Sequence, residues 1–188
     1  MEKAVSYMTK VLEELGVFDI EGMEEHFEET PKRIVKAWKE FLVNVKSEPD
    51  IKVFDNPGYN DIQLCRDIDI NSICAHHFFP FIGICHIAYL PKDKIIGLSK
   101  LSRIAKHFAK QPQIQERLVQ NIADFLMDSL EPQGCAVIVI ARHQCSACRG
   151  VESNSIFVDS AVRGVFLDDI SLKQEFYEML KISQSGTV

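Results

Sequence analysis

The sequence has none of the features that mark a membrane protein or a binder of polymeric nucleic acid. Its apolar runs are too short for a membrane span or a secretory signal, and acidic residues recur through the N-terminal segment. Positive charge is scarce, since 21 Lys and Arg face 27 Asp and Glu and leave a formal net charge of −6. We therefore expect a cytoplasmic protein whose partners include no membrane and no nucleic-acid polymer. Any phosphate site must be a local group of Lys and Arg.

Internal repeats and low-complexity segments are also absent from the sequence, and the cysteines do not indicate a disulfide-bonded secreted protein. The chain has six Cys but no export signal, so we expect reduced thiols, some of them free to bind a metal. With 188 residues, 46% of them hydrophobic, the chain can bury a core without disulfides or a structural metal. A metal must therefore be inferred from the chemistry of a site.

Residues 1–50 form the first region that the apolar pattern predicts, and this region is helical. Helical spacing covers 3–15 and resumes at 29–42, where Thr30 is positioned to cap the second helix.

Residues 51–188 form the second region, in which strand-like and helical patterns follow one another. The predicted strands lie within 51–90, at 136–141 and at 155–166, and the predicted helices at 99–109, 114–130 and 171–181. Gln111-Pro112 predicts a corner between two helices. This order of elements predicts an α+β domain with a largely antiparallel sheet.

The strongest chemical signal is the segment Cys74-Ala75-His76-His77, because a Cys and a His close together along a turn can direct sulfur and nitrogen at one ion. His143-Gln144-Cys145 follows an apolar strand and offers a third ligand. Three protein ligands with an open fourth position are typical of a catalytic zinc. Position alone leaves two alternatives open: core cysteines with surface histidines, or a Cys/His nucleophile pair.

Two further segments carry polar groups at predicted helix starts. Lys100 and Arg103 lie in one helical turn and can converge on phosphate oxygens, although a solvated basic face is the commoner arrangement. Glu116 can accept two hydrogen bonds from a guanine-like edge, or simply favour the helix dipole. Arg149 is followed by a flexible Gly150, which is a weak signal by itself.

Four motifs in order give the chain its resemblance to the GTP cyclohydrolase I family. They are Gly-Leu-Ser-Lys with an Arg three residues later at 97–103, Gln-x-Gln-Glu-Arg at 113–117, His-x-Cys at 143–145 and Arg-Gly at 149–150. The resemblance runs from about residue 29 to residue 176. It implies the tunnelling fold, a four-stranded antiparallel sheet with a helix pair, assembled as a homodecameric ring with sites between subunits.

The resemblance also implies a reaction and the residues that perform it. GTP and water would give 7,8-dihydroneopterin triphosphate and formate, with Zn2+ held by Cys74, His77 and Cys145 and acid–base catalysis by His76 and His143. The implied substrate-binding residues are Ser99, Lys100, Arg103, Gln115, Glu116 and Arg149. Glu116 and part of the phosphate clamp would face the zinc of a neighbouring subunit.

Three positions depart from the family pattern close to the implied site. Ala75 stands where the family has Glu, Gln111 where Arg is usual, and Cys148 where an apolar residue is usual. Cys148 could compete with Cys145 for metal or oxidise with it. We favour an ordinary cyclohydrolase. The alternatives are an enzyme that stalls at a ring-opened product or uses another purine nucleotide, and a catalytically silent nucleotide-binding ring.

Overall fold

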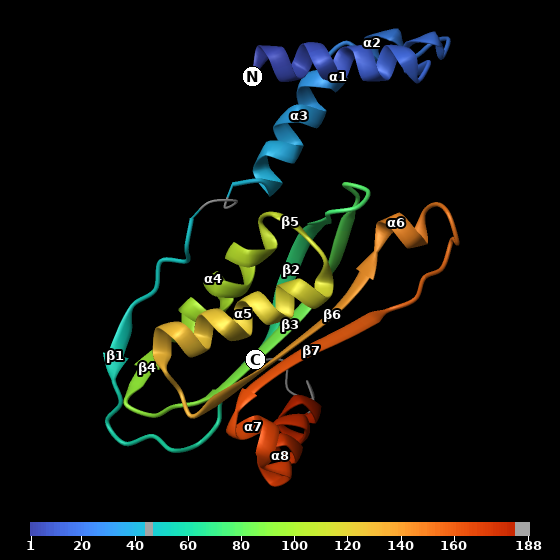
Figure 1. Cartoon of the computed structure of the whole chain (residues 1–188). Coiled ribbons are helices and arrows are strands. Elements are labelled where there is room, and N and C mark those ends of the chain that lie inside the picture. The colour runs from blue at the N-terminus through green and yellow to red at the C-terminus, as the bar shows by residue number, and fades with distance from the viewer. Residues whose placement is uncertain (44–46, 183–188) are drawn as a thin grey trace. The chain divides into compact units, whose positions relative to one another are not determined.

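The computed structural model describes residues 1–43 and 47–182 and divides the chain into two compact units, Met1–Val43 and Asn44–Val188. Within those residues no helix has the length and apolar character that a membrane span needs. Figure 1 shows the elements of each unit, and the second unit contains every sheet.

The first unit is helical, as its apolar spacing predicts. Its elements are α1 (Glu2–Glu14), a 3-10 turn η1 (Val17–Asp19), α2 (Glu24–Phe27) and α3 (Thr30–Phe41). The expected cap at Thr30 is wrong: its hydroxyl donates to the His26 carbonyl at 3.1 Å, and Glu29 is the N-cap. Since Glu28 and Glu29 are already in the αR region, the hydroxyl meets an upstream carbonyl rather than a free N–H.

A five-stranded sheet with the order β5-β2-β3-β6-β7 organises the second unit. Its strands are β2 (Gln63–Cys74), β3 (Pro80–Leu90), β5 (Pro112–Gln113), β6 (Gly134–His143) and β7 (Phe157–Gly164). The four long strands pair antiparallel, which confirms the α+β prediction. The expectation of four strands and a simple corner at Pro112 is incomplete, because β5 adds a short parallel edge to the end of β2. Pro is tolerated there because an edge strand needs no second ladder.

A second, two-stranded sheet pairs β1 (Val53–Asp55) with β4 (Lys94–Ile96). The sequence predicts a strand at 53–54 but gives no signal for β4, whose three residues show no alternation. This small sheet leads directly into α4 (Leu98–Ala109).

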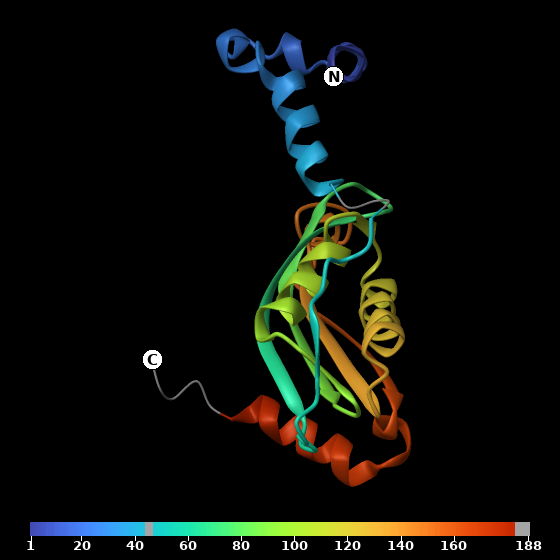
Figure 2. The same ribbon diagram turned by 90° about the vertical axis from the view of Figure 1, so that its left-hand side faces the viewer.

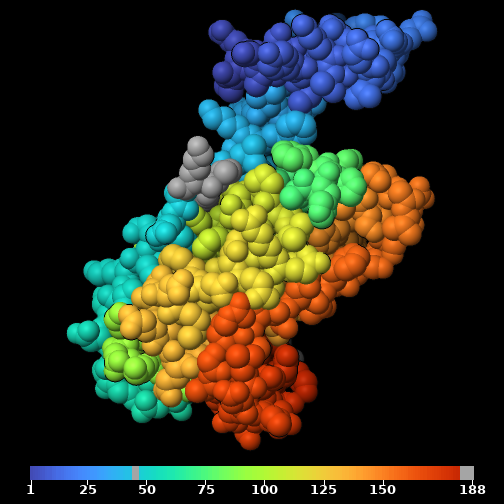
Figure 3. Space-filling view, in the orientation of Figure 1, coloured from blue at the N-terminus to red at the C-terminus, as the bar shows by residue number. Residues whose placement is uncertain are grey.

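Helices α4 and α5 (Gln115–Leu130) cover one face of the large sheet (Figures 1 and 2). α4 lies on β2, and α5 lies on β6 and β7. Every second residue of β6 faces them, so Cys135, Val137 and Val139 join the main core. The outer side of α5, in yellow, is seen along the surface in Figure 3.

The alternate residues of β6 face a second, smaller core on the other side of the sheet. Ala136 and Ile138 pack there with Phe166 and Phe176. These two aromatic residues come from α7 (Val165–Asp168) and α8 (Ile170–Lys181). Both faces of β6 are therefore buried over most of its length, which accounts for its continuous apolar sequence.

Candidate active site

The ends of three strands bring the predicted Cys and His residues together. β2 ends at Cys74, and β3 begins after a tight turn, with Phe81 paired to His143 at the end of β6. A four-residue helix, α6 (Gln144–Ala147), follows His143 at once and carries Cys145. The antiparallel register thus places two segments 66 to 71 residues apart in sequence at one edge of the sheet.

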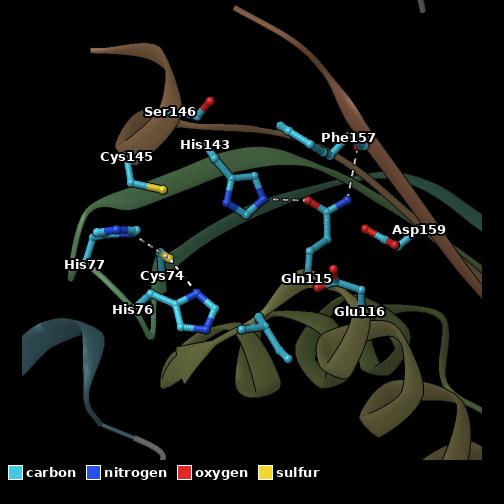
Figure 4. Close-up of a pocket in the computed structure, with 11 residues that line it drawn as sticks. Cys74, His76, His77, Gln115, Glu116, His143, Cys145, Ser146, Phe157 and Asp159 are labelled. Carbon is cyan, nitrogen blue, oxygen red and sulfur yellow. Dashed lines mark hydrogen bonds between the residues drawn. The ribbon is translucent and has the colours of Figure 1, made fainter. Parts of the chain in front are cut away.

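Cys74, His77 and Cys145 form a cluster whose ligand atoms all lie within 4.8 Å of one another. The Cys74 Sγ is 4.0 Å from the Nδ1 of His77 and also 4.0 Å from the Nδ1 of His76. Figure 4 shows the imidazoles of His76 and His77 on either side of the Cys74 sulfur. His76 is therefore a neighbour of the cluster, as the sequence predicts, but it is not one of its three members.

Backbone hydrogen bonds hold the turn between β2 and β3 in a conformation that directs the side chains of Cys74 and His77 toward the cluster. Phe78 has a φ of 55°, its N–H donates to the Cys74 carbonyl at 2.9 Å, and the Cys74 N–H donates to the Phe79 carbonyl at 2.8 Å. The N–H of Ala75 donates to the Gln113 carbonyl at 2.9 Å. This bond ties the turn to β5 and hence to the start of α5.

The donor set of the cluster is compatible with a metal ion. Burial raises the pKa of the Cys145 thiol, and the neighbouring Cys74 raises it further. Two thiolates this close repel each other unless a cation lies between them. A metal ion held by these three residues would have room for one further, non-protein ligand, as in catalytic sites.

A pocket of about 220 Å³ opens beside the cluster. Besides the three cluster residues, its lining includes His76, Gln115, Glu116, His143, Phe157 and Asp159. Glu116 therefore shares a pocket with the cluster of its own chain, which corrects the expectation that it faces the cluster of a neighbour. The reason is that β5 pairs with the last residues of β2 and starts α5 at that point.

His143 is held on three sides in this pocket. Its ring stacks on Phe81 with centroids 4.7 Å apart and a 10° interplanar angle, and it meets the edge of Phe157 at 5.4 Å. The Nε2 of His143 lies 2.9 Å from the Oε1 of Gln115. Burial lowers the pKa of His143, whereas the negative charges of Glu116 and Asp159 act in the opposite direction.

Asp159 is a pocket residue that sequence reasoning missed. It pairs with Val139 across the β6–β7 hairpin, so its side chain lies on the face of the sheet that α5 covers. Burial raises the pKa of Asp159, and the charge of Glu116 raises it further. One signal in the sequence could have identified it: Asp159 is a charged residue in a predicted strand and lies two residues before Ala161, which is buried, so both face the core.

Lys100 and Arg103, predicted to bind phosphate, and Ser99, predicted to lie near the ribose, do not line this pocket. They lie in the first turns of α4, which runs along β2: Ser102 contacts Cys65 at 3.7 Å, and the Ala109 carbonyl accepts from Ser72 at 2.7 Å. Nine residues of helix separate Lys100 from Ala109, or roughly 14 Å.

Two residues near Cys145 have different positions relative to the cluster. Arg149 does not line the pocket, but its charge lowers the pKa of Cys145 and so acts on the cluster. Cys148 is exposed, and its thiol donates to the Gln144 carbonyl at 2.8 Å. Cys148 is not a member of the Cys74–His77–Cys145 cluster.

Comparison with known proteins supplies the family context of this site. A model of the family described as GTP cyclohydrolase I matches residues 4–181. The GTP cyclohydrolase 1 of Aquifex aeolicus is 47% identical over 84% of this chain and 85% of its own length. The GTP cyclohydrolase 1 of Hydrogenobaculum sp. is 41% identical over 92% of this chain and 97% of its own length. The GTP cyclohydrolase 1 of Wolinella succinogenes is 40% identical over 86% of this chain and 90% of its own length.

The cluster geometry predicts that metal binding depends on Cys145 and not on Cys148. We expect about one metal ion per chain in the purified protein and in Cys148→Ser, and a large loss in Cys145→Ser, because a hydroxyl is a poor substitute for a thiolate ligand. Elemental analysis of the three proteins measures this. Full metal content in Cys145→Ser would show that the assignment is wrong.

The raised pKa of Asp159 predicts that its carboxylate opposes folding at neutral pH. A group whose pKa is raised above its ordinary value, here 3.8, binds a proton more tightly in the folded state, so its stabilising contribution is lost as the pH rises. We expect Asp159→Asn to increase the free energy of unfolding at neutral pH. The gain should shrink as the pH falls through the raised pKa.

Urea denaturation of wild type and variant at neutral pH and near pH 4 tests this expectation. Asp128→Asn, an exposed carboxylate at the other end of α5, is the matched control and should change little. A loss of stability in Asp159→Asn at neutral pH would mean that the carboxylate makes a favourable contact instead.

Proposed function

Since this chain belongs to the GTP cyclohydrolase I family, we propose that it converts GTP and water to 7,8-dihydroneopterin triphosphate and formate. One observation carries the proposal at the level of the site: the Cys74–His77–Cys145 cluster, His143 and Glu116 share a single pocket. Opening the imidazole ring of guanine needs an activated water, a proton carrier and a group that recognises the base. The pocket contains a candidate for each.

Zinc is the metal that we propose for the cluster, because soft thiolates combined with imidazole favour zinc over magnesium. Cys74, His77 and Cys145 would hold it. When bound, zinc supplies a Lewis acid that lowers the pKa of a coordinated water toward about 7.

The remaining pocket residues have roles that follow from their chemistry. Glu116, in the first turn of α5, offers two acceptor oxygens that match the N–H and amino group of guanine, whereas adenine presents no such pair of donors. His76 and His143 lie within reach of the same space and can move protons. His143 is the better defined of the two, because its ring contacts Phe81, Phe157 and Gln115.

The triphosphate requires residues that this pocket does not contain. Lys100 is separated from its own chain's Cys74 by most of the length of α4 and Arg103 by about half of it, and Ser99, proposed to lie near the ribose, is beside Lys100. We therefore propose that they serve the pocket of another subunit in a homo-oligomer, a decameric ring of tunnelling-fold domains. Arg149, whose charge acts on Cys145, would contact the triphosphate from the cluster's own chain.

Ala75 makes a stalled enzyme the second candidate. Its side chain is exposed and brings no carboxylate to the cluster. Asp159 supplies a different carboxylate to the same pocket, which favours the complete reaction. A silent nucleotide-binding ring has no comparable support, because the cluster and both histidines are present.

The proposed reaction predicts equal yields of formate and pterin from GTP. The metal-loaded protein is incubated with GTP, formate is measured enzymatically, and the pterin is measured by fluorescence after oxidation. We expect one formate for each pterin. Formate in excess of pterin would indicate the stalled enzyme, in which case Ala75→Glu should restore the balance, and neither product would leave only nucleotide binding.

Recognition by Glu116 predicts that Glu116→Gln reduces turnover of GTP much more than stability. Loss of an acceptor for two guanine donors leaves buried polar groups unpaired, which costs about 1–3 kcal/mol, or about a 5-fold to 150-fold loss in kcat/KM. Steady-state kinetics and thermal denaturation measure the two effects. Glu175→Gln, exposed on α8, is the control, and unchanged kinetics in Glu116→Gln would remove Glu116 from the binding site.

A further inference from the structure

The side-chain amide of Gln115 is held in one orientation by the sheet. Gln115 is only 2% exposed, and its Nε2 donates to the backbone carbonyls of Val139 on β6 and Phe157 on β7, both at 3.0 Å. Carbonyl oxygens can only accept hydrogen bonds, so the amide cannot be turned around without losing both bonds and leaving its oxygen against two oxygens. The Oε1 of Gln115 must therefore point away from these two carbonyls.

This fixed oxygen determines which nitrogen of His143 carries a proton. The Oε1 of Gln115 lies 2.9 Å from the Nε2 of His143 and has no hydrogen to donate. The bond forms only if Nε2 carries the hydrogen. In the neutral ring Nδ1 is then without a proton and is a hydrogen-bond acceptor.

The His143 ring is held in one orientation, which determines where its unprotonated nitrogen points. Phe81 stacks on the face of His143 and Phe157 meets it with an edge, so the ring cannot rotate freely. Figure 4 shows His143 with Gln115 on one side and the Cys74–His77–Cys145 cluster on the other. The edge of the ring that Gln115 does not bind is directed toward the space where water and substrate would meet.

We infer that Gln115 is a positioning residue that fixes His143 as the Nε2–H tautomer and so makes Nδ1 a proton acceptor toward the pocket. This inference rests on the proposed function and revises one role in it, because the motif at 113–117 suggested that Gln115 binds the substrate. All three hydrogen bonds of its amide are made within the protein. Both N–H groups are used in this way, so a nucleotide could meet only the second lone pair of Oε1.

The tautomer sets the order of proton transfers in the ring opening. When water adds to C8 of the base, the C8–O bond forms and the C8=N7 π pair moves to N7. The proton that leaves the water passes to Nδ1 of His143. The imidazolium then returns it to N7, which restores the starting tautomer. His143 therefore acts first as a base and only afterwards as an acid.

Nitrogen-15 NMR of the histidine-labelled, metal-loaded protein tests the inference directly. Spectra are recorded in the solid state at a pH where imidazole is neutral, and the His143 signals are identified by their absence in His143→Asn. We expect a protonated Nε2 and an unprotonated Nδ1. A protonated Nδ1 in the wild type would overturn the inference, whatever the variants do.

Two variants test whether Gln115 causes this tautomer. Gln115→Met keeps the size of the side chain but removes the acceptor, so the His143 signals should change to a mixture of tautomers. Gln113→Met is the matched control: Gln113 is 1% exposed, its amide donates to the Phe108 carbonyl at 3.2 Å, and it has no hydrogen bond to His143. It should lose stability but keep the His143 pattern. An unchanged pattern in Gln115→Met would overturn the positioning role.

Kinetics with GTP separate positioning from binding. In Gln115→Met we expect kcat to fall by about tenfold or more, with KM within about threefold, because the loss concerns proton transfer. A raised KM with unchanged kcat would mean that Gln115 binds the nucleotide and would overturn the inference. If the wild type does not turn over GTP, the proposed function fails, and the spectra still decide the tautomer.

Discussion

The antiparallel pairing of β3 with β6 is the constraint on which the rest of the second unit depends. The register that sets Phe81 opposite His143 also sets Ile87 opposite Val137 and Cys85 opposite Val139, which are core positions. A slip of one residue would turn these core side chains outward and His143 away from the pocket. The hydrophobic core under α4 and α5 therefore fixes the position of the site.

The short β5 extends this constraint to the helix that completes the pocket. Gln113 pairs with Cys74, and its carbonyl accepts the N–H of Ala75, so the start of α5 is tied to the turn that carries the cluster. Glu116 and Gln115 reach the pocket because of this attachment. The two residues of β5 add little to the sheet, but they determine where α5 begins relative to the cluster.

Periodicity predicts the long helices α1, α3, α4, α5 and α8 and the strands β6 and β7 to within a few residues, because each has an apolar face of regular spacing. For β2 and β3 it predicts only that strands lie within 51–90. The Cys74–His77–Cys145 cluster is what the family resemblance implies, whereas its two short motifs alone leave a metal site and a nucleophile pair open. Asp159 and the true partners of Gln115 could not be predicted, since they depend on cross-strand register. β4 and β5 could not be predicted for another reason, because they have too few residues to show a period.

On the proposed function, the distribution of charge separates the recognition of the base from that of the phosphates. The pocket gathers the carboxylates of Glu116 and Asp159 with the thiols of the cluster, whereas Lys100 and Arg103 lie in the first turns of α4. Negative charge beside the cluster favours a cation and the donor edge of guanine and repels a triphosphate. On the proposed function, a metal ion in the cluster and Arg149 offset part of this repulsion, and a further source of positive charge is needed for the triphosphate. On the proposed assembly the neighbouring α4 is that source, so the chain folds around its own core but becomes a catalyst only beside a second copy.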